Sequence, residues 1–217
     1  MKMTSSMSSP FAFVGGKPIE VGTFANPDAL APSESGIVAA DQSANGKLLV
    51  RGEAAEQIVA TTGVTQISVG RGVTLEHSSV YRLRQDLYFI HTIPGAAEEV
   101  AAQLVLAVSE RGVFVTVTDV THGRSELMLA GSDCRALMSK LCSLDFGEHA
   151  FPDNSAVQTS FAKTKQLITR RDKSGMSAFA VIGGRSSASY LWETTMEAGA
   201  EFGITPIGAS ALRAWRE

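Results

Sequence analysis

Two short apolar runs that end in glycine occur 79 residues apart in the chain. Leu48–Gly52 (LLVRG) recurs as Leu127–Gly131 (LMLAG). Because glycine suits a tight turn, each run predicts a strand that leads directly into a helix. Residues spaced i, i+3, i+4 and i+7 support both helices, since this spacing places them on one face. The two sets are Ala55, Ile58, Val59 and Thr62, and Cys134, Leu137, Met138 and Leu141.

The segments after these two helices also follow a common order. After the first come predicted strands at Ser78–Leu83 and Leu87–Ile93, a helix at Ala96–Ala107 and a strand at Val113–Thr118. After the second come strands at Val157–Phe161, Gln166–Thr169 and Ala178–Ile182 and a helix at Ser186–Ala198. The later helices have one-face sets at Ala97, Val100, Leu104 and Val108, and at Ala188, Leu191, Trp192 and Thr195. The order β-α-β-β-α-β is the split βαβ, or ferredoxin-like, order.

The repeat therefore predicts an α+β fold of tandem ferredoxin-like (split βαβ) units. We expect a flexible N-terminal arm at residues 1–20, a first ferredoxin-like half at 21–120, and a second half with a C-terminal tail at 121–217. The alternative is that any two β-α units look alike, so that the similarity has no further meaning.

Charge and hydropathy exclude several classes of protein. The 19 Lys and Arg against 22 Asp and Glu give a net charge of −3, which offers no basic field for nucleic acid or for a membrane surface. No uncharged apolar stretch approaches 18 residues, and the N-terminus has no apolar run of seven, so we expect neither a membrane span nor a signal peptide. Charged residues make up 19%, below the roughly 25% of an average soluble domain. We therefore expect a cytoplasmic protein that covers part of its surface with a partner.

The cysteines and histidines form no recognisable metal or redox motif. Cys134 and Cys142 lie eight residues apart on one predicted helix, which separates them by roughly 12 Å and excludes a disulfide. We expect both to be buried structural thiols. The histidines are scattered without HxH or HExxH spacing, so each is expected to be a surface or packing residue. They are His77, His91, His122 and His149.

Several longer segments resemble a known family. They are Val115–Pro152, which contains DVTHGR, LMLAG and LCSLDFGEHAFP; the Gln158-Thr159 step; Gly183–Ile204, which reads GGRSSASYLWETTMEAGAEFGI; and the tail ITPIGASALRAWRE. Through these segments the chain resembles, from about Gly36 to Trp215, the tetrahydrofolate-binding aminomethyltransferase superfamily, whose type member is the glycine-cleavage T-protein. Within it, the chain is similar to the gamma subunits of heterotetrameric sarcosine oxidases. The resemblance implies a fold like the N-terminal part of the T-protein.

The resemblance also implies a place in a larger flavoenzyme. Such assemblies have alpha, beta, gamma and delta subunits, oxidise sarcosine to glycine and pass the one-carbon unit to tetrahydrofolate. FAD, FMN, NAD, tetrahydrofolate and zinc are expected on the other subunits and no cofactor on this chain. We expect the chain to stabilise the complex by packing mainly on alpha, with no nucleic-acid or membrane partner. Tyr190 is the candidate interface aromatic, and Trp192 is expected in the core.

The match breaks where the family places its functional groups. In folate-binding members a Y-T-G-E segment precedes the last helix, and its Glu anchors the pterin. Here the aligned stretch is Arg170–Ser177 (RRDKSGMS), in which Asp172 is the only carboxylate. The Asn-Asp pair that supplies the catalytic Asp of T-proteins has no clear counterpart. We therefore expect no catalytic, cofactor-binding or metal-ligating residue on this chain.

Two alternatives to a subunit role follow from the residues. One is a free-standing folate-binding aminomethyltransferase-like protein of one-carbon metabolism, which would need Asp172 as its carboxylate. The other is an anion or nucleotide site at Ile182–Ser187, where two glycines between a strand and a helix leave backbone N–H groups free. Because the chain lacks GxxxxGK[ST] and GxGxxG motifs, a plain turn with Ser186 or Ser187 as N-cap is favoured. The absence of a GxSxG motif excludes a serine hydrolase of that type.

Overall fold

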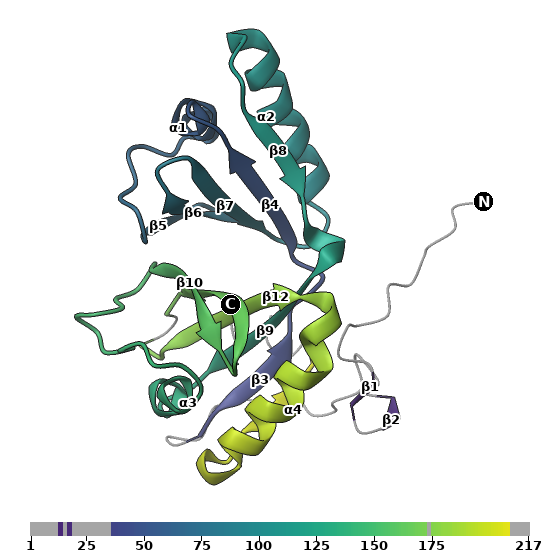
Figure 1. Cartoon of the computed structure of the whole chain (residues 1–217), viewed down its shortest axis with the longest axis vertical. Coiled ribbons are helices and arrows are strands. Elements are labelled where there is room, and N and C mark those ends of the chain that lie inside the picture. Colours follow the sequence, from purple (N-terminus) through teal and green to yellow (C-terminus); the bar gives the residue numbers. More distant parts are fainter. Residues whose placement is uncertain (1–12, 15–16, 19–35, 173–174, 209–217) are drawn as a thin grey trace.

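Two β-sheets packed face to face form the centre of the molecule. The computed structural model describes residues 13–14, 17–18, 36–172 and 175–208. The α-helices of this part are α1 (Ala55–Val59), α2 (Ala97–Arg111), α3 (Cys134–Leu141) and α4 (Ala188–Gly199). Helices α1 and α2 cover the outer face of one sheet, and α3 and α4 cover the outer face of the other (Figure 1). The layers therefore run helix, sheet, sheet, helix.

The first sheet has five antiparallel strands. Their spatial order is β5 (Gly72–Thr74), β6 (Ser78–Arg84), β7 (Leu87–Thr92), β4 (Gly46–Arg51) and β8 (Thr116–Asp119). Along the chain, β4, β6, β7 and β8 alternate with α1 and α2 in the split βαβ order, which confirms the prediction for the first half. Leu48, Ile58 and Leu104 are fully buried in the core between this sheet and its helices.

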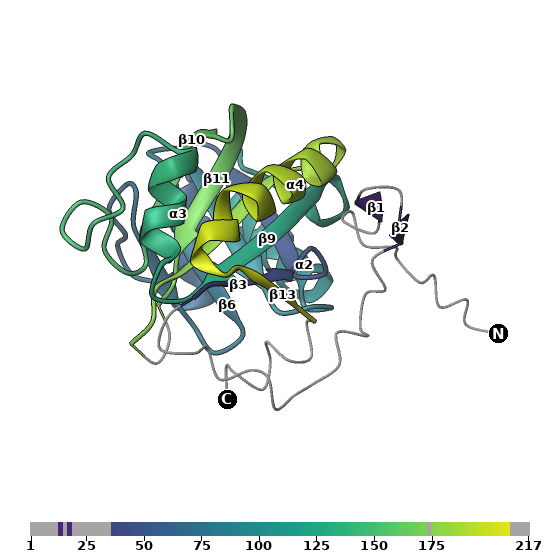
Figure 2. The same ribbon diagram turned by 90° about the horizontal axis from the view of Figure 1, so that it is seen from below.

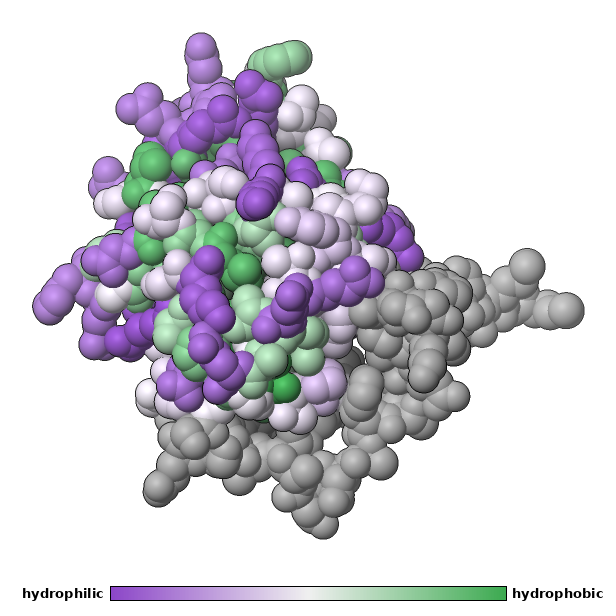
Figure 3. Space-filling view, turned by 60° about the horizontal axis from the view of Figure 1, so that its bottom comes forward, coloured by the Kyte–Doolittle hydropathy of each residue, from purple (hydrophilic) through white to green (hydrophobic). Residues whose placement is uncertain are grey.

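The second sheet has six strands. Their spatial order is β10 (Ala156–Phe161), β11 (Thr164–Arg170), β12 (Ala178–Gly184), β9 (Arg124–Ala130), β3 (Val38–Asp41) and β13 (Thr205–Ile207). Strand β13 runs parallel to β3, and the other neighbours are antiparallel. Leu129, Leu137 and Leu191 are fully buried between this sheet and α3 and α4. The side that carries these helices presents apolar residues interspersed with hydrophilic ones (Figure 3).

Several short elements complete the described residues. The 3₁₀ turns are η2 (Ala60–Thr62), η3 (Thr121–Gly123), η4 (Arg185–Ser187) and η5 (Ala200–Phe202). Within the expected N-terminal arm, β1 (Phe13–Val14) and β2 (Lys17–Pro18) form an antiparallel pair. The other residues of that arm, and residues 209–217 of the expected tail, lie outside the described residues.

Strand β3 lies in the second sheet although it precedes the first repeat in the chain. It takes the place beside β9 that the split order assigns to the last strand of the second unit. Strand β13 is then added outside it, at the edge of the sheet (Figure 2). The boundary expected at residue 120 falls between β8 and β9, whereas β3 from before that boundary pairs with β9 after it.

Strands β3 and β8 are equivalent strands that have changed places. Strand β3 leads into β4 but pairs with β9, and β8 leads into β9 but pairs with β4. Both end in the same turn. The carboxylate Oδ1 of Asp41 accepts the backbone N–H of Ser43 at 2.8 Å, and Oδ1 of Asp119 accepts that of Thr121 at 2.8 Å. Strand β3 of the first half thus completes the sheet of the second half, which interlocks the two halves.

The apolar faces predicted for the helices lie against the sheets. Most of their members are buried, and Thr62, Val100, Val108 and Leu141 are partly exposed. Trp192 is in the core and Tyr190 is 44% exposed, as expected of each. Cys134 and Cys142 are free and buried, and burial raises the pKa of the Cys134 thiol, which confirms structural thiols. Within the described part of the chain, no helix has the length and hydropathy to span a membrane.

Candidate functional site

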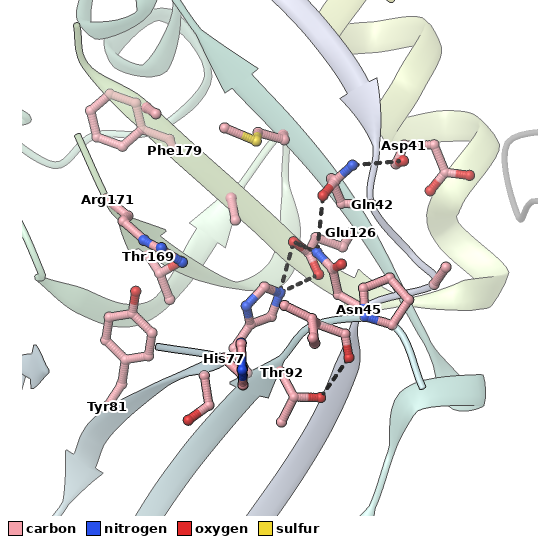
Figure 4. A pocket seen from close by; sticks show the side chains of 18 of the residues that line it. Asp41, Gln42, Asn45, His77, Tyr81, Thr92, Glu126, Thr169, Arg171 and Phe179 are labelled. Atoms are coloured by element: carbon pink, nitrogen blue, oxygen red, sulfur yellow. Dashed lines mark hydrogen bonds and ion pairs between the residues drawn. The ribbon is translucent and has the colours of Figure 1, made fainter. Parts of the chain in front are cut away.

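A cavity of about 480 Å³ lies between the two sheets. The first sheet contributes β7 and the start of β6, the second contributes β9, β11 and β12, and the loop from β3 to β4 closes one end (Figure 4). The volume falls within the range of roughly 300–1,000 Å³ that is typical of small-molecule sites. The lining side chains with polar or titratable groups include Asp41, His77, Tyr81, His91, Glu126 and Arg171.

A buried ion pair joins the two sheets at one wall of this cavity. Glu126 on β9 and Lys47 on β4 are 1% and 0% exposed, and Oε2 of the glutamate lies 3.0 Å from Nζ of the lysine. The ammonium group also donates to the backbone carbonyls of Ser43 at 3.2 Å and Asn45 at 2.8 Å. All three donors of Lys47 therefore have acceptors, as a charge fully removed from water requires.

His91 on β7 completes the environment of Glu126. Its Nε2 lies 3.0 Å from Oε1 and 2.9 Å from Oε2 of Glu126, and Nδ2 of Asn45 donates to Oε1 at 3.1 Å. Burial by itself raises the pKa of Glu126, but the charges of His91 and Lys47 outweigh it and lower the pKa to about 2. Glu126 is therefore a carboxylate with a donor on each oxygen. Such a group holds structure in place and has little capacity left to accept a proton from a substrate.

Lys47 and Glu126 occupy equivalent positions of the repeat, because each directly precedes its Leu48 or Leu127 strand run. The hydrogen bonds around them are reciprocal. The N–H of Lys47 donates to Oγ1 of Thr121 at 2.9 Å, and the N–H of Glu126 donates to Oγ of Ser43 at 3.0 Å. The ion pair therefore lies on the approximate twofold axis that relates the two halves.

A second polar group lies on the other side of the cavity. Tyr81, Thr169 and Arg171 lie close together there, near Phe179 (Figure 4). Burial raises the pKa of Tyr81, and the charge of Arg171 and hydrogen bonds from Thr169 and Ser79 counteract part of this rise. Arg171 is exposed to solvent and also lines the cavity. Its guanidinium group is therefore a cation that can bind an anionic ligand at the cavity opening.

Asp172, the carboxylate that the folate alternative requires, is engaged elsewhere. Its Oδ1 lies 2.9 Å from Nε of the fully buried Arg170, and its Oδ2 accepts Nη2 of the same guanidinium. Arg170 also donates from Nη1 to the carbonyl of Phe151 at 2.6 Å. Asp172 does not line the cavity, whereas Glu126 does. The carboxylate that borders the cavity is thus Glu126, and the requirement of the folate alternative for Asp172 stays a prediction.

We predict that Asp172→Ala lowers the free energy of unfolding by about 2 kcal/mol, because it leaves the Arg170 guanidinium buried without its counter-ion. The matched control is Asp86→Ala, which breaks the exposed ion pair with Arg51 and should cost less than about 0.5 kcal/mol. Urea denaturation of the three proteins measures both values. Equal losses in the two variants would contradict a structural role for Asp172.

The glycine-rich turn at Gly183–Ser187 has a packing explanation. A Cβ on Gly183 would lie 1.7 Å from Oε1 of Gln166, so the absence of a side chain at this glycine lets the buried Gln166 side chain lie directly against the strand. Ser187 is the N-cap of α4, as one of the two expected choices, but its Oγ donates to the carbonyl of Gly184 at 2.9 Å and caps no N–H. The turn is therefore explained without a bound phosphate.

The expected histidine roles need one addition. His91 packs between the sheets, as expected of a packing residue, but it also lines the cavity and contacts Glu126, which its isolated position in the sequence did not indicate. Among the described residues, no three His, Cys, Asp or Glu side chains come close enough together to hold a metal ion. The expectation of a chain without catalytic, cofactor-binding or metal-ligating residues remains a prediction.

The fold and the cavity define a class: an α+β protein of two interlocked halves with a ligand-sized space between its sheets. Residues 31–217 match the family model described as the GCVT N-terminal domain. The chain belongs to this aminomethyltransferase-like family.

Individual relatives are similar to the chain at low identity. The alpha subunit of sarcosine oxidase from Corynebacterium sp. (strain U-96) is 28% identical over 193 residues, which is 81% of this chain and 20% of that subunit. The chain thus spans about a fifth of the length of that relative.

Two solved structures share the fold. A chain of heterotetrameric sarcosine oxidase from Corynebacterium sp. U-96, in complex with pyrrole 2-carboxylate, matches with a TM-score of 0.70 and 20% identity, over 83% of this chain and 92% of that chain. Glycine cleavage system aminomethyltransferase T from Bartonella henselae matches with a TM-score of 0.65 and 18% identity, over 82% and 49%. The expected fold class is thereby confirmed.

Proposed function

We propose that this chain is a non-catalytic gamma-type subunit of a heterotetrameric sarcosine oxidase, an enzyme that demethylates sarcosine to glycine with tetrahydrofolate as one-carbon acceptor. The observation that carries the proposal is the extent of the match. The chain covers 92% of the matched chain in the solved heterotetramer, but only 20% of the alpha subunit. This near-complete coverage supports a role like that of the matched chain.

The site supports a role without chemistry of its own. The carboxylate of Glu126 in the cavity is held as an anion by a lysine, a histidine and an asparagine. Asp172 is held by Arg170. Both groups lack the free acceptor that a general base needs, and the lowered pKa of Glu126 disfavours proton uptake further. In the proposed assembly, FAD, FMN, NAD, tetrahydrofolate and zinc belong to the other subunits, and this cytoplasmic chain packs mainly on alpha.

Co-expression tests the proposal. The full chain is produced with the alpha, beta and delta subunits of its own organism, and the complex is weighed by native mass spectrometry. We expect one copy of the chain per assembly and a lower unfolding temperature of the complex when the chain is omitted. A chain that stays alone while the other three subunits assemble equally well without it would contradict the proposal.

A second candidate function is folate binding in a free-standing aminomethyltransferase-like protein. The cavity favours it, because about 480 Å³ of space is bordered by the Arg171 cation and the Tyr81 ring. A reduced folate carries carboxylates that a guanidinium binds well and a flat ring that stacks on aromatic groups.

For this second function we predict that tetrahydrofolate binds the isolated chain and that Arg171→Gln weakens binding at least about tenfold, since one charge-assisted contact is lost. Arg51→Gln is the matched control, because Arg51 is 63% exposed and does not line the cavity. Isothermal titration measures the three affinities. Absence of binding at millimolar tetrahydrofolate would remove this candidate and leave the subunit role.

A further inference from the structure

The outer edges of the two equivalent strands β3 and β8 differ. On β3, the edge that faces away from β9 is paired with β13, and the N–H of Thr205 donates to the carbonyl of Ile37 at 2.8 Å. On β8, the corresponding edge faces away from β4, and no strand among the described residues pairs with it. Strand β8 lies at the margin of its sheet, beside α2 (Figure 1).

The register shows which backbone groups this edge presents. The N–H of Val120 donates to the carbonyl of Lys47 at 2.9 Å, so Val120 points toward β4. Because successive residues of an antiparallel strand point alternately to its two neighbours, Thr118 and Thr116 also point toward β4. Val117 and Asp119 therefore direct their N–H and C=O groups away from the sheet. Val117 and Asp119 are equivalent in the repeat to the residues of β3 that form hydrogen bonds with β13.

An exposed aromatic side chain stands at the start of this edge. Phe114, two residues before β8, is 91% exposed, the highest value among the large hydrophobic side chains that the structure describes. Its equivalent in the other half is Gly36, because Gly36 contacts Gly131 as Phe114 contacts Gly52. The open edge thus carries an anchor that the covered edge lacks. Exposed aromatic residues of this kind are enriched in the centres of protein interfaces.

We propose that the β8 edge binds an extended segment of a partner subunit, which adds to the first sheet as a strand parallel to β8 in the way that β13 adds to β3. The backbone of the segment bonds to Val117 and Asp119, and an apolar side chain near its start packs on Phe114. Strand addition at an exposed edge draws its affinity from main-chain hydrogen bonds and its specificity from such side-chain contacts. The pairing of β13 with β3 in the other sheet indicates the parallel direction and the register that we expect for the bound segment on β8. This inference rests on the proposed subunit role.

Hydrogen exchange of the full chain, alone and in the co-expressed complex with alpha, beta and delta, provides the first test. In the complex, we expect the amides of Val117 and Asp119 to exchange at least about 100-fold more slowly than in the free chain. Protection of these amides already in the free chain, as monomer or dimer, would mean that another segment or a second copy covers the edge. That result would overturn the partner assignment.

Two variants provide the second test. Val117→Pro removes an N–H that does not pair with β4, and proline is tolerated at such edge positions. Phe114→Ala removes the anchor. We expect each to weaken assembly with alpha at least about tenfold while the free chain still folds, with an unchanged unfolding temperature for Phe114→Ala and a modest decrease for Val117→Pro, whose side chain packs on the core. Tyr190→Ala, on the exposed side of α4, tests the alternative interface that the sequence suggested; if the β8 edge is the contact, this variant should assemble as the unsubstituted chain does.

The outcomes separate the two proposals. If the complex forms and both β8 variants assemble normally, the edge proposal is overturned and the subunit role stands. If Tyr190→Ala prevents assembly and the β8 variants do not, the interface lies over α4. If the unsubstituted chain fails to join the complex, the subunit role fails, and the edge proposal fails with it.

Discussion

Replacement of Glu126 by glutamine is expected to lower the free energy of unfolding by about 3–5 kcal/mol. The amide keeps the shape of the side chain but removes the negative charge that lies 3.0 Å from Lys47 Nζ, in a place where Lys47 is fully buried. An ammonium group without a counter-ion there must either remain charged at high cost or lose its proton on folding. Both alternatives favour the unfolded state.

A double-mutant cycle distinguishes the ion pair from general disruption. Lys47→Met should cost less than Glu126→Gln, because Glu126 then keeps His91 at 2.9 Å and Asn45 at 3.1 Å as hydrogen-bond partners. The double variant should cost less than the sum of the two single variants, because no unpaired charge remains. Urea denaturation at neutral pH measures all four proteins. A loss below about 1 kcal/mol for Glu126→Gln would contradict the importance of the pair.

The same pair predicts how stability depends on pH. The pKa of Glu126 is lowered from its ordinary value of 4.5 to about 2 in the folded chain. Since the unfolded chain takes up the proton first as the pH falls, the stabilisation is complete above about pH 4.5 and is lost progressively toward pH 2. The lowered pKa therefore contributes stability at neutral pH that is absent at strongly acidic pH. Glu126→Gln should lose this part of the acid sensitivity, and an identical pH profile in both proteins would contradict the assignment.

The elements that the sequence predicted are those with a strong local pattern. The strand runs at Leu48 and Leu127 and the helices after them have apolar faces that their own spacing reveals. Strand β8 was less well placed, because Val113–Thr118 is an apolar β run, yet the paired residues begin only at Thr116. The run reads as one strand in sequence, but Phe114 turns into solvent.

The exchange of β3 and β8 could not be predicted from local pattern. Val38–Asp41 is four residues long, which is too short for a period to show, and its partner β9 lies far along the chain. Which strand sits beside β9 depends on the loop from β3 to β4, whose Ser43 and Asn45 reach across to Glu126 and Lys47. Which strand pairs with β9 is therefore determined by tertiary packing and not by the local sequence.

Most of the candidate site could not be predicted from local sequence patterns either, although one feature of the repeat pointed to its ion pair. Lys47, His91 and Glu126 are widely separated in sequence, and none lies in a motif with metal or catalytic spacing. However, Lys47 and Glu126 directly precede the two copies of the repeated strand run and carry opposite charges. The repeat places these two opposite charges at equivalent positions of two buried strands. From this pattern the Lys47–Glu126 ion pair could have been inferred.

Gly131→Ala is expected to destabilise the chain by about 4 kcal/mol or more, because the exchanged strand leaves no room for a side chain. Gly131 has φ of +141°, and a Cβ there would lie 2.1 Å from the backbone carbonyl oxygen of Gly36, at the start of the β3 segment. Both the backbone conformation and the contact exclude alanine.

Gly131 and its repeat equivalent Gly52 can be compared with Gly112 to test how the two halves interlock. A Cβ on Gly52 would meet the carbonyl of Phe114 at 2.5 Å, at φ of +149°, whereas a Cβ on Gly112, at φ of +60°, would meet nothing within 4 Å. Gly112→Ala should therefore cost only about 1 kcal/mol. Hydrogen exchange should show loosening of β3 and β13 in Gly131→Ala and of β8 in Gly52→Ala, because each alanine displaces the strand segment that packs against it. If Gly131→Ala is no more harmful than Gly112→Ala, β3 is not seated against β9 as described, and the exchange of strands between the halves is wrong.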